Sequence, residues 1–116
     1  MTSFTPRRDI PRRVVVTGMN GVTSLGSDWA SIEANIRAGR NGIRTMHDWA
    51  GIEGLLTHLA GPIPDFSKPA HYTRKQTRSM GRVAIMATRS AEVALTEADL
   101  LNNPCITDGR MGVAYG

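Results

Sequence analysis

The chain has 116 residues, a formal net charge of +4 and a single cysteine. This length suits one domain, no apolar run approaches the ~18 residues of a membrane span, and one cysteine excludes a disulfide framework or a cysteine-rich zinc site. Aromatic residues make up only 5% of the chain and the basic residues are scattered. We therefore expect a cytoplasmic protein that contacts neither a membrane nor nucleic acid.

Residues 1–11 are predicted to form a basic tail, because they combine Thr, Ser, Pro and Arg with few apolar side chains. Such a run is typical of a solvated arm. Residues 14–17, Val-Val-Val-Thr, follow as a continuous apolar run. A strand that is apolar on both faces belongs inside a sheet that helices cover on both sides, so we expect a buried strand here.

A glycine-containing connection over residues 18–26 leads into a short predicted helix. Either Ser27 or Asp28 suits the N-cap of this helix. Gly39 stands where a C-terminal cap residue with a positive φ is expected. The apolar stripe of the helix recurs at helical spacing in Trp29, Ile32 and Ile36.

Residues 42–72 are predicted to be irregular, because prolines interrupt them. From about residue 73 to 98, an alanine-rich apolar stripe of helical period predicts one long helix that can approach its neighbour closely. Residues 102–104, Asn-Asn-Pro, are expected to stop this helix. Residues 110–115 then predict a second buried strand.

Two apolar strands cannot cover their own faces and edges. A sheet needs at least three strands, or packed helices, to be stable independently. No polar closing segment follows Tyr115. We therefore expect the natural protein to continue, with this chain as an N-terminal piece of a larger domain.

The glycines after residues 14–17 raise the question of a dinucleotide-binding turn. Such a turn needs the spacing G-x-G-x-x-G, so that the backbone can approach a pyrophosphate at a helix N-terminus. The glycines here are Gly18, Gly21 and Gly26, and no second apolar strand ends in an acidic residue about 20 residues later. The spacing favours a structural glycine turn, and we expect no cofactor.

Cys105 and the histidines form no pattern of a catalytic or metal site. Cys105 lies in a turn-rich segment, whereas a reactive thiolate needs a helix N-terminus or a neighbouring cation, so we expect a small, partly buried loop residue. His47, His58 and His71 lack the i, i+4 helical spacing of a specific metal site, and no metal is expected. His71 and Tyr72 are interpreted as neighbours in sequence only.

Cations gather at the predicted start of the long helix, in the run Arg74-Lys75-Gln76-Thr77-Arg78. A helix N-terminus carries positive partial charge, so cations are locally unfavourable there. One interpretation is a solvated first turn with extended side chains. The other is a surface that docks anions, in which helix-end amides and side-chain charges act together. The residues alone favour neither interpretation.

Several short stretches form a set by their order and spacing: Arg-Arg-Val-Val-Val-Thr-Gly at 12–18, Ala-Gly-Arg-Asn-Gly-Ile at 38–43, Leu-Ala-Gly at 59–61, Asp-Phe at 65–66, Arg-Lys-Gln-Thr-Arg-Ser-Met at 74–80, Ala-Leu-Thr-Glu-Ala at 94–98 and Arg-Met-Gly-Val-Ala-Tyr-Gly at 110–116. This set resembles the N-terminal part of the β-ketoacyl-acyl-carrier-protein synthases. These are the decarboxylating condensing enzymes of fatty acid and polyketide synthesis. The resemblance extends over nearly the whole chain after residue 11.

The chain departs from the usual pattern of this family at a few positions. The family usually has a second glycine at Asn20, a proline at Ser24, an acidic residue at Gly81 and a glycine at Asp99. Asparagine is the best non-glycine residue for a positive φ, so Asn20 is expected to preserve the turn. These departures point to a divergent member that serves a specialised pathway such as aryl-polyene synthesis.

The resemblance implies an α/β, thiolase-like layered αβαβα fold, of which residues 12–116 are an incomplete N-terminal part that ends before the catalytic cysteine. The family uses a cysteine nucleophile at a helix N-terminus, which attacks an acyl thioester, and two histidines, which stabilise the enolate that forms when a malonyl-thioester loses carbon dioxide. These residues come later in the chain. We therefore expect no catalytic residue within residues 1–116, an inactive fragment, and neither a cofactor nor a metal.

The resemblance also implies a homodimer and an acidic acyl carrier protein as its partner. The family places basic residues at the start of the long helix, near the mouth of the substrate tunnel. Lys75 and Arg78 match those positions, and Arg74 is a weaker third member of the docking site. Ser79 stands where the family often has lysine, so we expect weaker docking or a preference for another carrier.

Two alternatives stay open. A non-catalytic subunit resembling a chain-length factor has the same fold, forms a heterodimer with an active synthase and lacks the nucleophile; the residue that distinguishes it lies beyond Gly116. A nucleotide-binding α/β domain belongs to another class of protein, and the glycine spacing argues against it.

Overall fold

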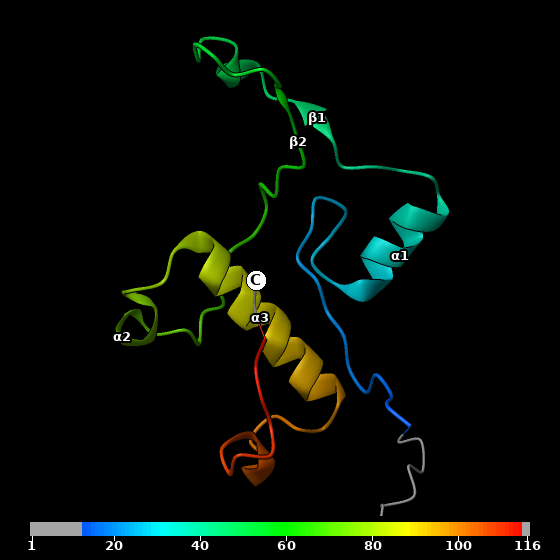
Figure 1. Ribbon diagram of the computed structural model, residues 1–116, viewed down its shortest axis with the longest axis vertical. Helices are drawn as coiled ribbons and strands as arrows, with labels where there is room; N and C mark the ends of the chain where they lie inside the picture. Colours follow the sequence, from blue (N-terminus) through cyan, green and yellow to red (C-terminus); the bar gives the residue numbers. More distant parts are fainter. Residues whose placement is uncertain (1–12, 115–116) are drawn as a thin grey trace, which may run out of the picture.

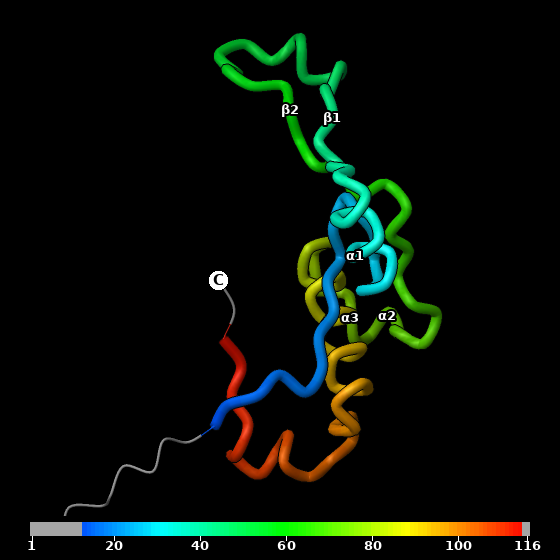
Figure 2. The backbone as a smooth tube through the Cα atoms, turned by 90° about the vertical axis from the view of Figure 1, so that its right-hand side faces the viewer, coloured from blue at the N-terminus to red at the C-terminus, as the bar shows by residue number. Residues whose placement is uncertain are grey.

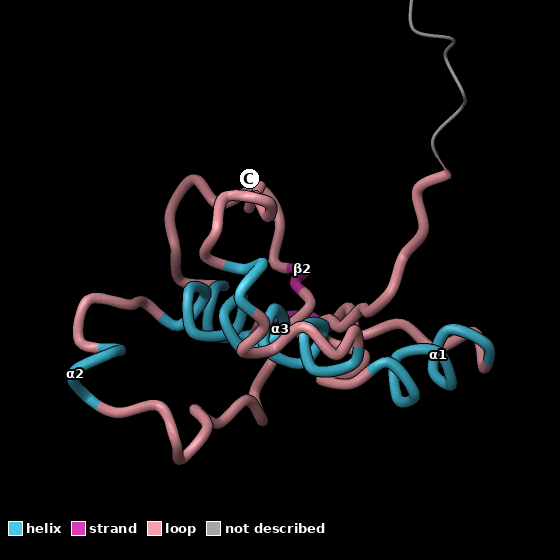
Figure 3. The backbone as a smooth tube through the Cα atoms, turned by 90° about the horizontal axis from the view of Figure 1, so that it is seen from below, coloured by secondary structure: helices cyan, strands magenta, loops and turns pink. Residues whose placement is uncertain are grey.

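The computed structural model describes residues 13–114, so the predicted basic tail at residues 1–11 lies outside the described residues. Figure 1 shows the longest helix, α3, in the middle, with α1 on one side and α2 on the other. Figure 3 shows that loops make up much of the remaining chain. The elements in chain order are α1 (Trp29–Arg37), β1 (Arg44–Thr45), the 3-10 helix η1 (His47–Trp49), β2 (Leu59–Ala60), α2 (Arg74–Thr77), α3 (Arg82–Glu97) and the 3-10 helix η2 (Pro104–Ile106).

Helix α1 confirms the predicted short helix together with its caps. Asp28, and not Ser27, is the N-cap: its carboxylate accepts hydrogen bonds from the backbone N–H and the hydroxyl of Ser31, at 2.9 and 2.7 Å. Gly39 follows the helix with a φ of 65°, as predicted for this position. Ile32 points inward and is 6% exposed, and it is the one buried hydrophobic residue within residues 13–114.

The long helix predicted over residues 73–98 is in fact two helices, so this prediction is wrong. A break separates α2 from α3, and Gly81 is the N-cap of α3 with an extended backbone (φ −73°, ψ 170°). Glycine costs about 1 kcal/mol relative to alanine inside a helix, whereas it is accepted at an N-cap. Gly81 therefore suits the start of α3 better than the interior of one long helix.

The C-terminal end of α3 agrees with the prediction. Its last residue is Glu97, one residue before the predicted end at about residue 98, so the chain has already left the helix before residues 102–104, which were expected to stop it. Asp99 has a φ of 55°, which lies in the left-handed region and turns the chain away from the helix axis. Asp99 therefore adopts the backbone conformation that glycine favours just after the end of a helix.

Residues 14–17 and 110–114 do not form the predicted strands. The one ladder among residues 13–114 joins β1 to β2 in antiparallel register, with Arg44 opposite Ala60 and Thr45 opposite Leu59. A strand requires a hydrogen-bonding partner, which an apolar composition cannot itself supply. Tyr115, the last residue of the second predicted strand, lies outside the described residues. The valines of both segments are exposed: Val14 94%, Val15 66%, Val16 78% and Val113 94%.

The region predicted to be irregular, residues 42–72, is mainly loop but contains the small β1–β2 hairpin that the sequence did not indicate. Figure 2 shows this hairpin as an arm that projects away from the helices. The arm exposes apolar side chains, with Leu56 99% and Ile52 53% accessible. Within residues 13–114, no helix combines the length and the apolar run that crossing a bilayer requires.

The glycine-containing loop packs against the C-terminal half of α3, which confirms its structural role. A Cβ atom on Gly18 would lie 2.2 Å from the carbonyl oxygen of Ala94, so only glycine permits this approach of two backbones. The next residue, Met19, donates its N–H to Glu97 Oε2 at 2.8 Å. Asn20 does not have a positive φ, so the expectation that it substitutes for a glycine through its backbone is wrong.

Candidate functional site

The predicted docking cations lie on α2, a single helical turn that its own sequence caps. Thr73 and Gln76 form a capping box: Thr73 N–H donates to Gln76 Oε1 at 2.9 Å, and Gln76 N–H donates to Thr73 Oγ1 at 3.4 Å. This arrangement satisfies two backbone donors of the first turn. Arg74 and Lys75 are the first two residues of α2, and Arg78 is its C-cap.

The cations therefore do not stand at the N-terminus of the long helix, as the sequence predicted. They lie on a separate turn that precedes α3, and the break at Gly81 separates the two helices. The expected conflict between these charges and the positive end of the long helix does not arise. All three side chains, those of Arg74, Lys75 and Arg78, are exposed.

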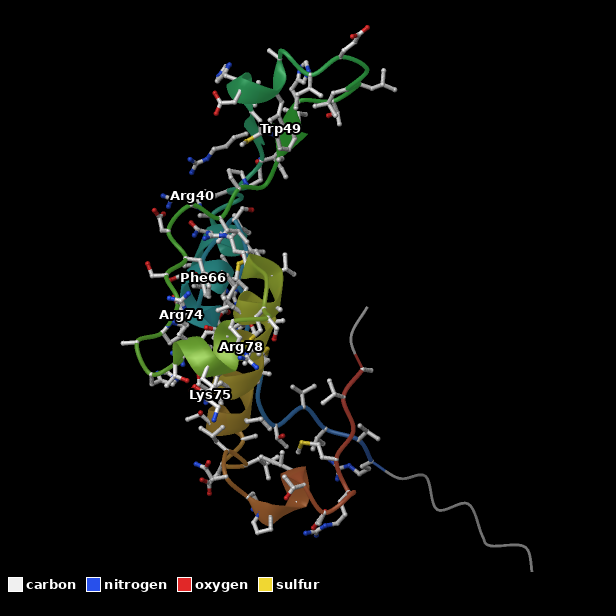
Figure 4. The ribbon with its side chains drawn as sticks, turned by 90° about the vertical axis from the view of Figure 1, so that its left-hand side faces the viewer. Arg40, Trp49, Phe66, Arg74, Lys75 and Arg78 are labelled. Carbon is white, nitrogen blue, oxygen red and sulfur yellow. The ribbon has the colours of Figure 1, made fainter. Side chains whose placement is uncertain are left out.

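No carboxylate within residues 13–114 neutralises these three cations. Figure 4 shows Arg74, Lys75 and Arg78 on the α2 segment, with Arg40 and Trp49 farther toward the hairpin. Their charges are therefore available to an anionic surface from outside. The ion pairs of the described residues involve other side chains: Arg37–Glu33, His71–Glu92, Arg89–Glu92 and Arg110–Asp108.

Beside α2, Glu92 on α3 forms hydrogen bonds with three polar side chains. The ring nitrogen Nε2 of His71 lies 2.6 Å from Oε1, the hydroxyl of Tyr72 donates to Oε2 at 2.8 Å, and Arg89 donates to Oε2 at 2.7 Å. The Glu92 side chain is 20% exposed. The hydrogen bond from Arg89, supported by those from Tyr72 and His71, lowers the pKa of Glu92 to about 2.

The same cluster changes the titration of Tyr72. Partial burial, reinforced by the hydrogen bond to Glu92, raises the pKa of Tyr72 to about 12. The interpretation of His71 and Tyr72 as sequence neighbours only is wrong, because both side chains meet the same carboxylate. The sequence separations of 20 and 21 residues hid these contacts. The available signal was an acidic residue, Glu92, one helical turn after Arg89 within α3.

A second contact fixes the start of the segment that carries α2. The Arg82 guanidinium at the start of α3 donates from Nη2 to the carbonyl oxygen of Ile63 at 2.5 Å and from Nη1 to that of Phe66 at 3.4 Å. Its Cζ also lies 5.7 Å from the centre of the Phe66 ring, within cation–π range. The loop before α2 is therefore attached to the first residue of α3.

Cys105 lies in η2 and is half-buried, which confirms the predicted partly buried loop residue. Its N–H donates to the side-chain oxygen of Asn103 at 3.0 Å, so the local contacts of this residue are those of a turn. Within residues 13–114, no three side chains of His, Cys, Asp and Glu come together as at a metal site.

Comparison with known proteins identifies the family. The model of the family described as "Beta-ketoacyl synthase, N-terminal domain" matches residues 11–116. The chain belongs to the β-ketoacyl synthase family. This confirms the resemblance found in the sequence, and the alternative of a nucleotide-binding domain is wrong.

The chain is similar to several known proteins along most of its length. It is 35% identical over 94 residues to nodulation protein E of Rhizobium meliloti (strain 1021), covering 79% of this chain and 22% of the relative. It is 30% identical over 105 residues to 3-oxoacyl-[acyl-carrier-protein] synthase 1 of Haemophilus influenzae, covering 90% of this chain and 25% of the relative. For 3-oxoacyl-[acyl-carrier-protein] synthase 2 of Staphylococcus aureus (strain COL), the identity is 33% over 105 residues, with the same shares of each chain.

A solved structure gives the fold. The β-ketoacyl synthase from Burkholderia phymatum STM815 matches with a TM-score of 0.78 and 56% sequence identity, over 88% of this chain and 25% of that chain. The predicted fold class is therefore confirmed: the chain follows the N-terminal part of the thiolase-like fold. It spans about a quarter of the length of the relatives that it matches.

Proposed function

We propose that the chain is the N-terminal quarter of a β-ketoacyl-acyl-carrier-protein synthase, called here the whole enzyme. This acyltransferase extends an acyl chain by two carbons through decarboxylative Claisen condensation. It acts in the cytoplasm, as a homodimer, in fatty acid synthesis or in synthesis of the polyketide or aryl-polyene type. Family membership supports the reaction class, and two of the relatives are named 3-oxoacyl-[acyl-carrier-protein] synthases.

Within this function, residues 13–114 contribute the surface that receives the carrier protein. The observation that carries this proposal is the group of exposed cations on α2, Arg74, Lys75 and Arg78, which no carboxylate of the described residues neutralises. An acidic carrier protein has the complementary charge. The nucleophilic cysteine and the two histidines that the family uses belong to the remainder of the whole enzyme.

Charges at the rim of an interface act mainly on association. They steer the encounter of the partners and make its rate depend on salt, and they contribute less to the chemical step. The Debye length is about 8 Å at physiological ionic strength, so added salt weakens such steering. Loss of these charges should therefore slow the reaction of substrate delivered by the carrier protein, but not the turnover of a small thioester that needs no docking.

The first prediction concerns the double charge reversal Lys75→Glu, Arg78→Glu in the whole enzyme. We expect the KM for acyl carrier protein to rise about tenfold at low salt, with little change in kcat on a small acyl thioester. The difference should shrink at high salt. Steady-state kinetics with the two substrates at two ionic strengths measures all three effects.

The matched control reverses two exposed cations far from α2, Arg37→Glu together with Arg110→Glu, which changes the net charge equally. Their side chains are 77% and 72% exposed and form surface ion pairs, which contribute little stability. This control should leave the KM for carrier protein near its original value. Equal losses on both substrates, or equal effects of the two double variants, would contradict the docking role of α2.

A further inference from the structure

Residues 63–81, which precede α3 in the chain, are called here the arch. The arch begins beside the first residue of α3, Arg82, carries α2 and joins α3 at Gly81. Figure 3 shows α2 out on this loop beside α3. The arch is short of apolar packing where α2 faces α3. A pocket of about 320 Å³ lies between them, lined by Tyr72, Gln76, Thr77, Met80 and Thr88. Among the described residues, side-chain packing alone therefore does not fix the position of α2.

Polar contacts to α3 hold the arch at two points instead. Arg82 binds the carbonyl oxygens of Ile63 and Phe66 at the start of the arch, so this end is attached to the first turn of α3. Nearly three turns further along the same helix, Glu92 binds His71 and Tyr72 in the middle of the arch. The two attachment points lie on one rigid helix and therefore define the course of the loop between them.

The second attachment point is directly connected to the docking cations. Tyr72 is followed by Thr73, the N-cap of α2, and by Arg74, its first residue. Lys68 strengthens the connection from inside the arch, since its Nζ donates to the Tyr72 carbonyl oxygen at 2.7 Å. A displacement of Tyr72 therefore moves the cap of α2 and, with it, the cations of the turn.

The carboxylate at this point is well suited to act as an anchor. Arg89, one turn before Glu92 on the same helix, donates to Oε2 and keeps the carboxylate oriented toward the arch. Hydrogen bonds to an ionised acceptor are about twice as strong as neutral ones, and the side chain is only 20% exposed. The anchor is thus a charge-assisted network, whereas an exposed ion pair alone would contribute little.

We propose that Glu92 is a positioning residue for carrier-protein docking: through His71 and Tyr72 it holds the arch on α3, and thereby sets the place and orientation of Lys75 and Arg78. This inference rests on the proposed function. A surface that is ordered before the partner arrives loses less conformational entropy on binding. Release of the anchor should therefore weaken docking although the cations themselves remain.

The test substitutes Glu92→Gln and, separately, Tyr72→Phe in the whole enzyme. For each variant we expect the KM for acyl carrier protein to rise about threefold to tenfold, while kcat and the turnover of a small thioester stay unchanged. Glu92→Gln removes a negative charge, which by long-range electrostatics alone would attract an acidic partner more strongly. The change in net charge alone would lower the KM for the acidic carrier protein. A rise in KM would therefore show that the position of the cations, and not the net charge, has changed.

Glu33→Gln is the matched control, because Glu33 pairs with Arg37 on α1 and its removal changes the net charge in the same way. It should leave the KM unchanged or lower it slightly. The decisive step adds Glu92→Gln to the double variant Lys75→Glu, Arg78→Glu. If Glu92 acts through these cations, the added substitution raises the KM no further, which is the non-additivity expected of coupled residues.

The outcomes separate this inference from the proposed function. If the charge reversal raises the KM but Glu92→Gln does not, the positioning role is refuted and docking on α2 stands. If the charge reversal itself has no effect on the KM, the proposed docking surface fails, whatever Glu92 does. A loss of equal size on carrier protein and small thioester would show that Glu92 supports the fold or the active site, and the positioning role would also be overturned.

Discussion

The side chain of Glu92 forms hydrogen bonds with three other side chains, those of His71, Tyr72 and Arg89. The hydrogen bond from Arg89 is the main reason why its pKa lies at about 2 instead of 4.5, and Tyr72 and His71 add to the effect. A carboxyl group whose pKa is lower in the folded state stabilises that state when it is ionised. This stabilisation is fully present above the ordinary pKa of 4.5 and is lost as the pH falls toward about 2.

A prediction on pH dependence follows for the whole enzyme. The difference in free energy of unfolding between the unsubstituted enzyme and Glu92→Gln should be constant from about pH 7 to 5 and should shrink as the pH approaches about 3. Denaturant titration at several pH values measures it. Because His71 binds the same carboxylate, both proteins should additionally carry His71→Asn, so that Glu92 is compared in the same surroundings. A difference that does not change down to about pH 3 would show that the ionised form of Glu92 stabilises nothing.

Asp99 is the second residue whose environment leads to a prediction. The end of α3 is a Schellman motif: Asp99 N–H donates to the Thr96 carbonyl oxygen at 3.1 Å, and Leu100 N–H to that of Leu95 at 2.8 Å. The φ of Asp99, 55°, is unfavourable for a residue with a Cβ atom. We expect Asp99→Gly to raise the free energy of unfolding of the whole enzyme by about 0.5–1 kcal/mol, measured by denaturant unfolding.

The end of α1 provides a reciprocal control for this prediction. Gly39 occupies the equivalent position with a φ of 65°, and a Cβ atom there would meet nothing within 4 Å. Gly39→Asp should therefore destabilise the protein by a similar amount through backbone conformation alone. If Asp99→Gly were neutral while Gly39→Asp was costly, a favourable contact of the Asp99 side chain would have to compensate, and the strain argument for Asp99 would be wrong.

At the scale of the elements, the sequence predicts a helix or strand well when the residues that determine it lie close together in the chain. The stripe of Trp29 and Ile32, the N-cap at Asp28 and the glycine at position 39 lie within a few residues of one another, and α1 forms as predicted. The break before α3 could also have been found, since Gly81 lies inside the helical pattern. The prediction followed the helical period of the apolar residues and disregarded this one glycine. Glycine is unfavourable inside a helix but accepted at an N-cap, and both properties indicated a helix start at Arg82.

The contacts between elements could not be predicted in this way. Lys75 and Arg78 were proposed as docking residues through family resemblance, but the contacts of Glu92 with His71 and Tyr72 beside them were missed. Glu92 and Tyr72 are 20 residues apart, and no periodicity relates them. The hairpin was missed for a similar reason, because its strands have two residues each and are joined by a long loop. Such contacts depend on how the chain returns to itself, which local propensity does not encode.

At the scale of the whole molecule, the described chain is open. Its radius of gyration is 20.5 Å, whereas a compact domain of about 100 residues has about 13 Å. The predicted strands at residues 14–17 and 110–114 are apolar because they suit the inside of a sheet, yet within residues 13–114 they have no partner strand. The prediction of buried strands is therefore wrong for the described residues: an apolar composition suits the inside of a sheet, but these segments are exposed and pair with no other strand within residues 13–114.

The last prediction concerns the 116-residue chain expressed alone. Only Ile32 among its hydrophobic side chains is buried within residues 13–114, and Val14, Leu56 and Val113 are more than 90% exposed. A domain folds only if the free energy gained by burying apolar surface exceeds the cost of lost conformational entropy. Because this chain buries so little apolar surface, it should lack a cooperative thermal transition. We expect it to bind a hydrophobic dye strongly and to associate, which calorimetry, dye fluorescence and analytical ultracentrifugation measure. The whole enzyme is the control and should unfold in a sharp transition. A sharp two-state transition from a dilute, monomeric 116-residue chain would contradict the prediction, because it would require a core that the exposed valines and leucine do not form.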